Sequence, residues 1–255
     1  MREDLASLLE QCNWPQLPER YDRALREAVR FIFTRFDDVL GIVVSGTILR
    51  GTASPTSDLD ISVIHAQLWR QRLQRFFEGI PAEIFVNPPS KILKYFKDER
   101  HAGRPVTAHM WTTGHIVFDK SPKVSELQAL AREVLERPPA YDCEQLTGAR
   151  YRAAFRYEDA TDVVNTHPVT ANMILATVVY DMIRYHFMAR SRYLPRDKDL
   201  LRALDDLDPD LARLTRAFYG AVELDERLAL AEEIARCTIQ THGFFEWESE
   251  PEDVE

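Results

Sequence analysis

Residues 45–60 read Ser45-Gly46-Thr47-Ile48-Leu49-Arg50-Gly51-Thr52-Ala53-Ser54-Pro55-Thr56-Ser57-Asp58-Leu59-Asp60, and this stretch indicates the fold. The β-branched run before it, residues 39–44, predicts a buried strand that ends next to Gly46. Glycine lets the backbone approach a ligand closely, and a hydroxyl with free N–H groups at the start of a short helix suits a phosphate. We therefore expect a strand, a phosphate-binding loop and a second strand.

Two carboxylates close this stretch. Asp58 and Asp60 flank Leu59 in the second expected strand, residues 58–64, and the two-residue period of a strand puts both on one face, about 6–7 Å apart. The two charges repel each other unless a cation lies between them, so a divalent metal is their natural partner. A lone Asp-x-Asp is otherwise typical of a solvated strand end.

A third acid lies in another short apolar run. Glu83 is surrounded by alanine, isoleucine, phenylalanine and valine in a strand expected over residues 81–87, where an acid is out of place unless it faces the same site. The alternative is an edge-strand acid that faces water. Three carboxylates without a histidine or cysteine cluster favour Mg²⁺ over zinc.

Gly46-Thr47, ten further residues and then Asp58-Leu59-Asp60 resemble the signature of nucleotidyltransferases of the DNA polymerase β superfamily, in particular the minimal and the aminoglycoside and lincosamide (kanamycin-type) enzymes. The resemblance implies a nucleotidyltransferase that uses two Mg²⁺ ions and an NTP, expected to be ATP. It would move a nucleoside monophosphate to a hydroxyl of a small, antibiotic-like acceptor and release pyrophosphate. It also implies that Asp58, Asp60 and Glu83 are catalytic metal ligands.

The resemblance assigns the loop to the nucleotide. Gly46, Thr47 and Ser57 would hold the triphosphate, and Arg50 occupies a position that is common in the family, with its role open. In the helical second half, a general base or a site for a cationic amine is expected among Glu158, Asp159 and Asp162. Lys198 could reach a phosphate. The alternative for these four residues is a solvated surface.

The periodicity of the whole chain predicts an α/β (α+β) protein. A small mixed sheet flanked by helices is expected in residues 1–138, with the motif core at about 38–120, followed by an all-helical bundle over 139–245. Helices are expected over residues 19–36, 68–78, 90–100 and 124–135. Arg70, Arg72 and Arg75 would then lie on a solvated helix face. The acidic tail, residues 246–255, is expected to be disordered.

The composition bears on three classes of function: nucleic-acid binding, secretion and membrane insertion. The 255 residues carry a net charge of −9, which argues against a dedicated nucleic-acid binder. The last ten residues hold six of the acids and no base, so the rest of the chain carries −3 and this argument weakens. The N-terminus lacks an apolar signal-peptide core, no apolar run could span a membrane, and three distant cysteines suit a reducing compartment, so we expect a cytoplasmic enzyme.

Three hypotheses about the function stay open. Besides the small hydroxyl acceptor, the acceptor could be a protein or a tRNA, as in antitoxin-like nucleotidyltransferases. The chain could also be a non-catalytic nucleotide-binding module, because a fold does not by itself fix an activity. Resemblance to the kanamycin-type enzymes allows a homodimer.

Overall fold

The computed structural model describes residues 4–249 and 251. The chain divides into two compact units, one made of the residues up to Arg100 with Pro105–Arg137, the other of His101–Arg104 with the residues from Pro138 onward. Each unit is described by itself. Of the acidic tail, residues 250 and 252–255 lie outside the described residues, and so do residues 1–3 at the N-terminus.

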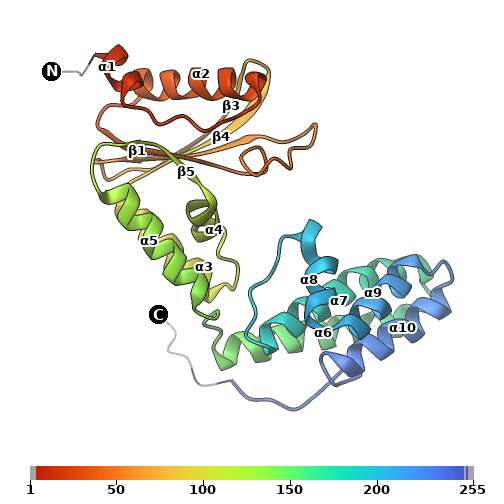
Figure 1. Ribbon diagram of the computed structural model, residues 1–255. Helices are drawn as coiled ribbons and strands as arrows, with labels where there is room; N and C mark the ends of the chain where they lie inside the picture. Colours follow the sequence, from red (N-terminus) through yellow and green to blue (C-terminus); the bar gives the residue numbers. More distant parts are fainter. Residues whose placement is uncertain (1–3, 250, 252–255) are drawn as a thin grey trace. The chain divides into compact units, whose positions relative to one another are not determined.

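Within the described residues, the first unit contains one five-stranded mixed sheet with the strand order β3-β4-β2-β1-β5 (Figure 1). The strands are β1 (Val39–Ser45), β2 (Leu59–His65), β3 (Gln71–Phe77), β4 (Ile80–Asn87) and β5 (His115–Asp119). β2 and β4 are parallel, and the other neighbouring pairs are antiparallel. A mixed sheet flanked by helices is the fold class that the sequence predicts.

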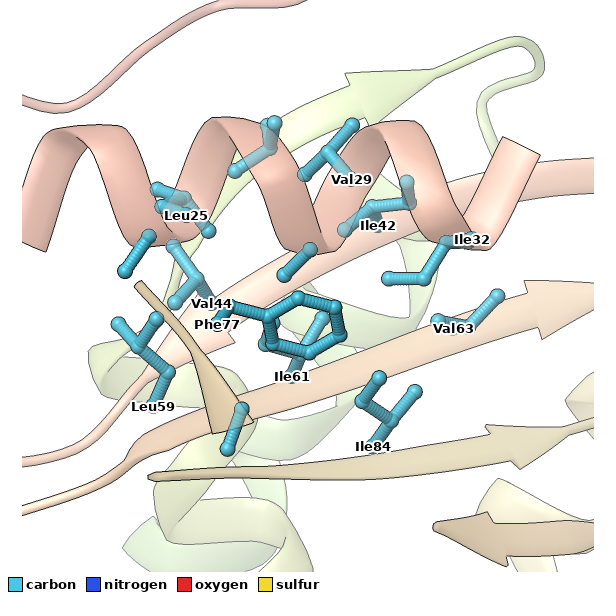
Figure 2. Close-up of a cluster of buried hydrophobic side chains, with 14 of the residues drawn as sticks. Leu25, Val29, Ile32, Ile42, Val44, Leu59, Ile61, Val63, Phe77 and Ile84 are labelled. Atoms are coloured by element: carbon cyan, nitrogen blue, oxygen red, sulfur yellow. The ribbon is translucent and has the colours of Figure 1, made fainter. Parts of the chain in front are cut away.

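Helix α2 (Glu19–Arg35) covers one face of the sheet. Its apolar residues recur every three or four positions, so that Leu25, Val29 and Ile32 form one buried stripe. Figure 2 shows this stripe packed against side chains that alternate along the strands, among them Ile61 of β2 and Ile84 of β4. This packing fixes the register of the strands, because a slip by one residue would turn each apolar set away from the helix.

The opposite face is covered by helices only in part. Val43 and Ile64 pack on that side against α3 (Pro89–His101), α4 (Val106–Thr113) and α5 (Lys123–Glu136). The short helix α1 (Leu5–Glu10) precedes α2. Helix α4 is not anticipated from the sequence, whereas α2, α3 and α5 lie close to their predicted ranges.

Residues 71–77 form strand β3, so the helix predicted over residues 68–78 is wrong. The strand follows from a two-residue hairpin in which Glu78 and Gly79 have φ values of +49° and +73° and Phe77 pairs with Ile80. Positive φ at both central residues is typical of the tight turn whose twist suits an antiparallel pair. The basic residues at 72 and 75 therefore lie on an edge strand and not on a helix face.

The second unit is built from helices in the described residues. They are α6 (Cys143–Val163), α7 (Pro168–Ala189), the 3₁₀ turn η1 (Asp197–Asp199), α8 (Leu200–Leu207), α9 (Pro209–Gly220) and α10 (Leu224–Cys237). They enclose a core of their own, which includes Leu175, Met182 and Phe218. No helix among the described residues is long and apolar enough to cross a membrane.

Candidate metal and nucleotide site

Strand register brings the three predicted acids together. Asp60 lies opposite Ser45 in the antiparallel pair β1–β2 and opposite Glu83 in the parallel pair β2–β4. Asp58 directly precedes β2, two residues before Asp60, and so points to the same face. Each of the three residues is half-buried and offers a carboxylate oxygen, and these oxygens all lie within 4.8 Å of one another. We call Asp58, Asp60 and Glu83 the acid cluster.

Gly46 leaves space beside the carboxylates of the acid cluster because it has no side chain. Its φ of +101° lies in the region that side chains other than glycine rarely adopt. A Cβ atom added there would lie 2.9 Å from Oδ2 of Asp60 and 3.6 Å from the carbonyl oxygen of Asp58. The glycine therefore serves both the turn at the end of β1 and the space beside the carboxylates.

Hydroxyl groups close the loop that follows. Oγ1 of Thr47 lies 2.8 Å from Oγ of Ser57, and the backbone N–H of Ser54 donates to the same Ser57 oxygen over 2.8 Å. The N–H of Thr52 donates to the carbonyl oxygen of Thr47 over 3.1 Å. Residues 47–51 form a hydrogen-bonded turn, where a short helix is predicted. The turn keeps Thr47 and Ser57 together, and these two residues directly adjoin Gly46 and Asp58 in the chain.

Burial and the crowding of like charges change the titration of Asp60. Burial, followed by the neighbouring charges of Asp58 and Glu83, raises the pKa of Asp60 to about 6, although Arg50 and Arg72 act in the opposite direction. A carboxyl group with this pKa holds a proton more readily than an ordinary aspartate does. A bound cation would relieve the same repulsion, so the cluster has the charge and the ligand atoms for a divalent metal.

Two residues of β3 hold the third acid. Nη2 of Arg72 donates to Oε1 and Oε2 of Glu83 over 2.8 and 2.7 Å, and Nε2 of Gln74 donates to Oε1. Arg72 is 60% exposed, whereas Glu83 is only 21% exposed, so the arginine lies on the solvent side of the carboxylate. The sequence prediction missed both residues. The Glu78-Gly79 turn would have placed Gln74 opposite Glu83 and Arg72 two residues away on the same face of β3.

Of the remaining predicted residues, Arg50 belongs to the first unit and the other four belong to the second. Arg50 is exposed on the loop and acts on Asp60 through its charge. In the second unit, Glu158 and Asp159 are half-buried on α6, Asp162 is exposed one turn later, and Lys198 is exposed in η1. The carboxylate of Glu158 packs beside Gly243.

Comparison with known proteins supports the fold. No protein-family model matches the chain, and no curated protein matches it by sequence. Among solved structures it is similar to a nucleotidyltransferase-like protein from Exiguobacterium sibiricum 255-15, with a TM-score of 0.55 and 14% sequence identity. The match covers 84% of this chain and 74% of the other. At this identity the likeness shows a nucleotidyltransferase-like fold and nothing finer.

Proposed function

We propose that the protein is a Mg²⁺-dependent nucleotidyltransferase that moves a nucleoside monophosphate from an NTP to an acceptor hydroxyl. One observation carries the proposal, namely that three carboxylates meet within 4.8 Å beside a glycine turn in a nucleotidyltransferase-like fold. The donor set supports the choice of metal, because carboxylate oxygens are the ligands that Mg²⁺ prefers. ATP is the first NTP to test.

In this proposal, Asp58, Asp60 and Glu83 would hold two Mg²⁺ ions. Bound divalent cations neutralise charge on the transferring phosphoryl group and lower the pKa of an attacking hydroxyl. Gly46, whose missing side chain leaves the space beside Asp60 open, lets the triphosphate approach the carboxylates. The hydroxyl of Thr47 orients the phosphates.

The reaction forms one bond and breaks another. The acceptor oxygen attacks the α-phosphorus of the NTP, the bond between that phosphorus and the bridging oxygen breaks, and pyrophosphate leaves. The proton of the acceptor hydroxyl passes to a carboxylate of the acid cluster. Arg72 has two roles in this proposal. It balances the charge of Glu83 while no cation is bound, and it pairs with an anionic substrate once a cation is bound.

A transfer assay tests this function. The full chain is incubated with each α-³²P-labelled NTP, Mg²⁺ and a panel of hydroxyl acceptors that includes antibiotics, nucleosides, oligonucleotides and proteins. We expect a labelled product and an equal amount of pyrophosphate with wild type, and neither with Asp58→Asn/Asp60→Asn. Variants of Glu158, Asp159, Asp162 and Lys198 in the same assay test the helical-unit roles. No Mg²⁺-dependent product above the double variant on any acceptor would contradict the proposal.

A further inference from the structure

The sheet face that carries the acid cluster continues beyond Glu83. Glu83 and Phe85 lie two residues apart on β4, so both point to this face. Arg72 of β3 pairs with Phe85, and its guanidinium carbon lies 5.0 Å from the centre of the Phe85 ring while it also bonds Glu83. The side chain of Arg72 therefore links the acid cluster to an aromatic ring.

A second aromatic ring with its own cations follows. Arg70, two residues before Arg72, donates from Nη1 to the hydroxyl of Tyr95 on α3 over 2.6 Å. Nζ of Lys91 lies 4.7 Å from the centre of the same ring. We call Arg70, Arg72, Phe85, Lys91 and Tyr95 the basic-aromatic strip. Both rings are half-buried, and both arginines are exposed.

The charges and aromatic rings of the strip indicate which class of ligand it can bind. The strip carries three cations, and the charge of the acid cluster that it adjoins would be offset by bound metal, so the strip attracts an anion and repels a cationic amine. Alternating cations and aromatic rings are what single-stranded nucleic acids contact, because phosphates pair with the cations while bases stack on rings and guanidinium groups. The net charge of −9 does not oppose this, since six acids lie in the last ten residues.

We infer that the acceptor is the end of a single-stranded nucleic acid, which lies along the basic-aromatic strip with its terminal hydroxyl at the acid cluster. This inference rests on the proposed function, because it names the acceptor of that reaction. The terminal hydroxyl oxygen bonds to the α-phosphorus of the NTP, pyrophosphate leaves, and the strand becomes one nucleotide longer. A small cationic amine, one of the ligands considered for Glu158, Asp159 and Asp162, would not suit these residues.

Oligonucleotide binding tests the strip apart from the chemistry. The fluorescence anisotropy of a labelled 12-nucleotide single strand is followed with the full chain, without NTP, across a series of salt concentrations. We expect Arg70→Gln/Lys91→Gln to weaken binding and to make its salt dependence shallower by about 0.7 per lost phosphate contact. Tyr95→Leu should weaken binding about tenfold through lost stacking or cation–π contact.

A matched control removes the same charge elsewhere. Arg23→Gln/Lys123→Gln also loses two cations, from exposed positions on α2 and at the start of α5, and should bind the strand like wild type. A cooperative urea unfolding transition like that of wild type shows that the strip variants are folded. Equal binding of wild type and strip variants would overturn the inference. So would equal binding of a blunt duplex or of polyglutamate with the same number of charges, because then the bases are not read.

Two outcomes separate the inference from the proposed function. If the chain binds NTP with Mg²⁺ but no oligonucleotide, the acceptor assignment fails and nucleotidyl transfer stands. If it binds the oligonucleotide through the strip but no NTP, nucleotidyl transfer fails, and with it the acceptor role of the strip.

Discussion

The α-carbon of Gly46 faces Oδ2 of Asp60 so closely that an added Cβ atom would lie 2.9 Å from that oxygen. A side chain at this position would therefore displace a carboxylate of the acid cluster, beyond the strain that a φ of +101° imposes. This contact joins the loop and the acids into one site, and a substitution that adds one methyl group at Gly46 tests it.

Gly46→Ala should weaken Mn²⁺ binding, measured by calorimetry, at least tenfold. Gly51→Ala is the matched control, because Gly51 also has a positive φ, +69°, but no atom lies within 4 Å of its added Cβ. Both variants should lose about 1 kcal/mol of unfolding free energy through backbone strain, and Gly46→Ala should lose more because of its contact with Asp60. Mn²⁺ binding that falls equally in the two variants would show that the contact with Asp60 has no role.

The pKa of Asp60, about 6 in the folded chain against an ordinary value of 3.8, predicts a pH-dependent stability. The folded state binds this proton more tightly than the unfolded state does, so the metal-free protein gains stability as the pH falls from 7 toward 4. Asp60→Asn removes the penalty. At pH 8 the unfolding free energy of Asp60→Asn, measured in urea, should therefore exceed that of wild type by about 3 kcal/mol.

The stability gap between Asp60→Asn and wild type should shrink at pH 5, where Asp60 is largely protonated. A gap that stays constant between pH 8 and pH 5 would contradict the raised pKa. In wild type, Mn²⁺ affinity should rise as the pH increases through 6, because the metal competes with the proton for the same carboxylate.

The Glu78-Gly79 hairpin offers a test of strand β3. Glu78 has a φ of +49°, which asparagine adopts more readily than glutamate does. Glu78→Asn should therefore raise the unfolding free energy by about 0.5 kcal/mol in urea titration. Gly79→Pro, which cannot reach the φ of +73° at this position, should destabilise the protein by more than 1 kcal/mol. A loss of stability in Glu78→Asn would argue against this turn.

The loop hydroxyls should act on the nucleotide more than on the metal. Thr47→Val removes the hydroxyl that lies 2.8 Å from Ser57 Oγ and keeps the shape of the side chain. We expect NTP affinity with Mg²⁺ to fall about fivefold to thirtyfold, which is the range of one or two hydrogen bonds. Mn²⁺ binding without nucleotide should be unchanged. Thr47→Ser, which keeps the hydroxyl, should restore NTP affinity.

Much of the first unit could be predicted because its signals are local. The β-branched runs of β1 and β4 and the helical spacing in α2 each indicate their element without knowledge of the rest. Strand β3 could not be predicted in this way, since glutamine, arginine and leucine favour helices and the pairing with β4 decides the outcome. Helix α4 could not be predicted from local signals either, because a residue of another helix caps its start. The carboxylate of Glu99 accepts from the N–H and the hydroxyl of Thr107.

The candidate site likewise contains residues that local sequence signals predict and residues that only strand pairing places. Asp58 and Asp60 are found from their spacing, and Glu83 from its place in an apolar strand. Arg72 and Gln74 reach Glu83 through the register of the β3–β4 hairpin, so their signal in the sequence is the Glu78-Gly79 turn that sets this register. The basic and aromatic side chains that adjoin Glu83 favour an anionic acceptor, whereas the sequence predicts a site for a cationic amine among Glu158, Asp159 and Asp162.

The most direct measurement is calorimetric titration of a non-hydrolysable α,β-methylene NTP analogue into the full chain, with and without Mg²⁺. Wild type should bind the analogue at least a hundredfold more tightly with Mg²⁺ than without it, and Asp58→Asn/Asp60→Asn should lose that gain. Binding that is independent of Mg²⁺, or equal in the double variant and wild type, would contradict the acid cluster as a metal and nucleotide site.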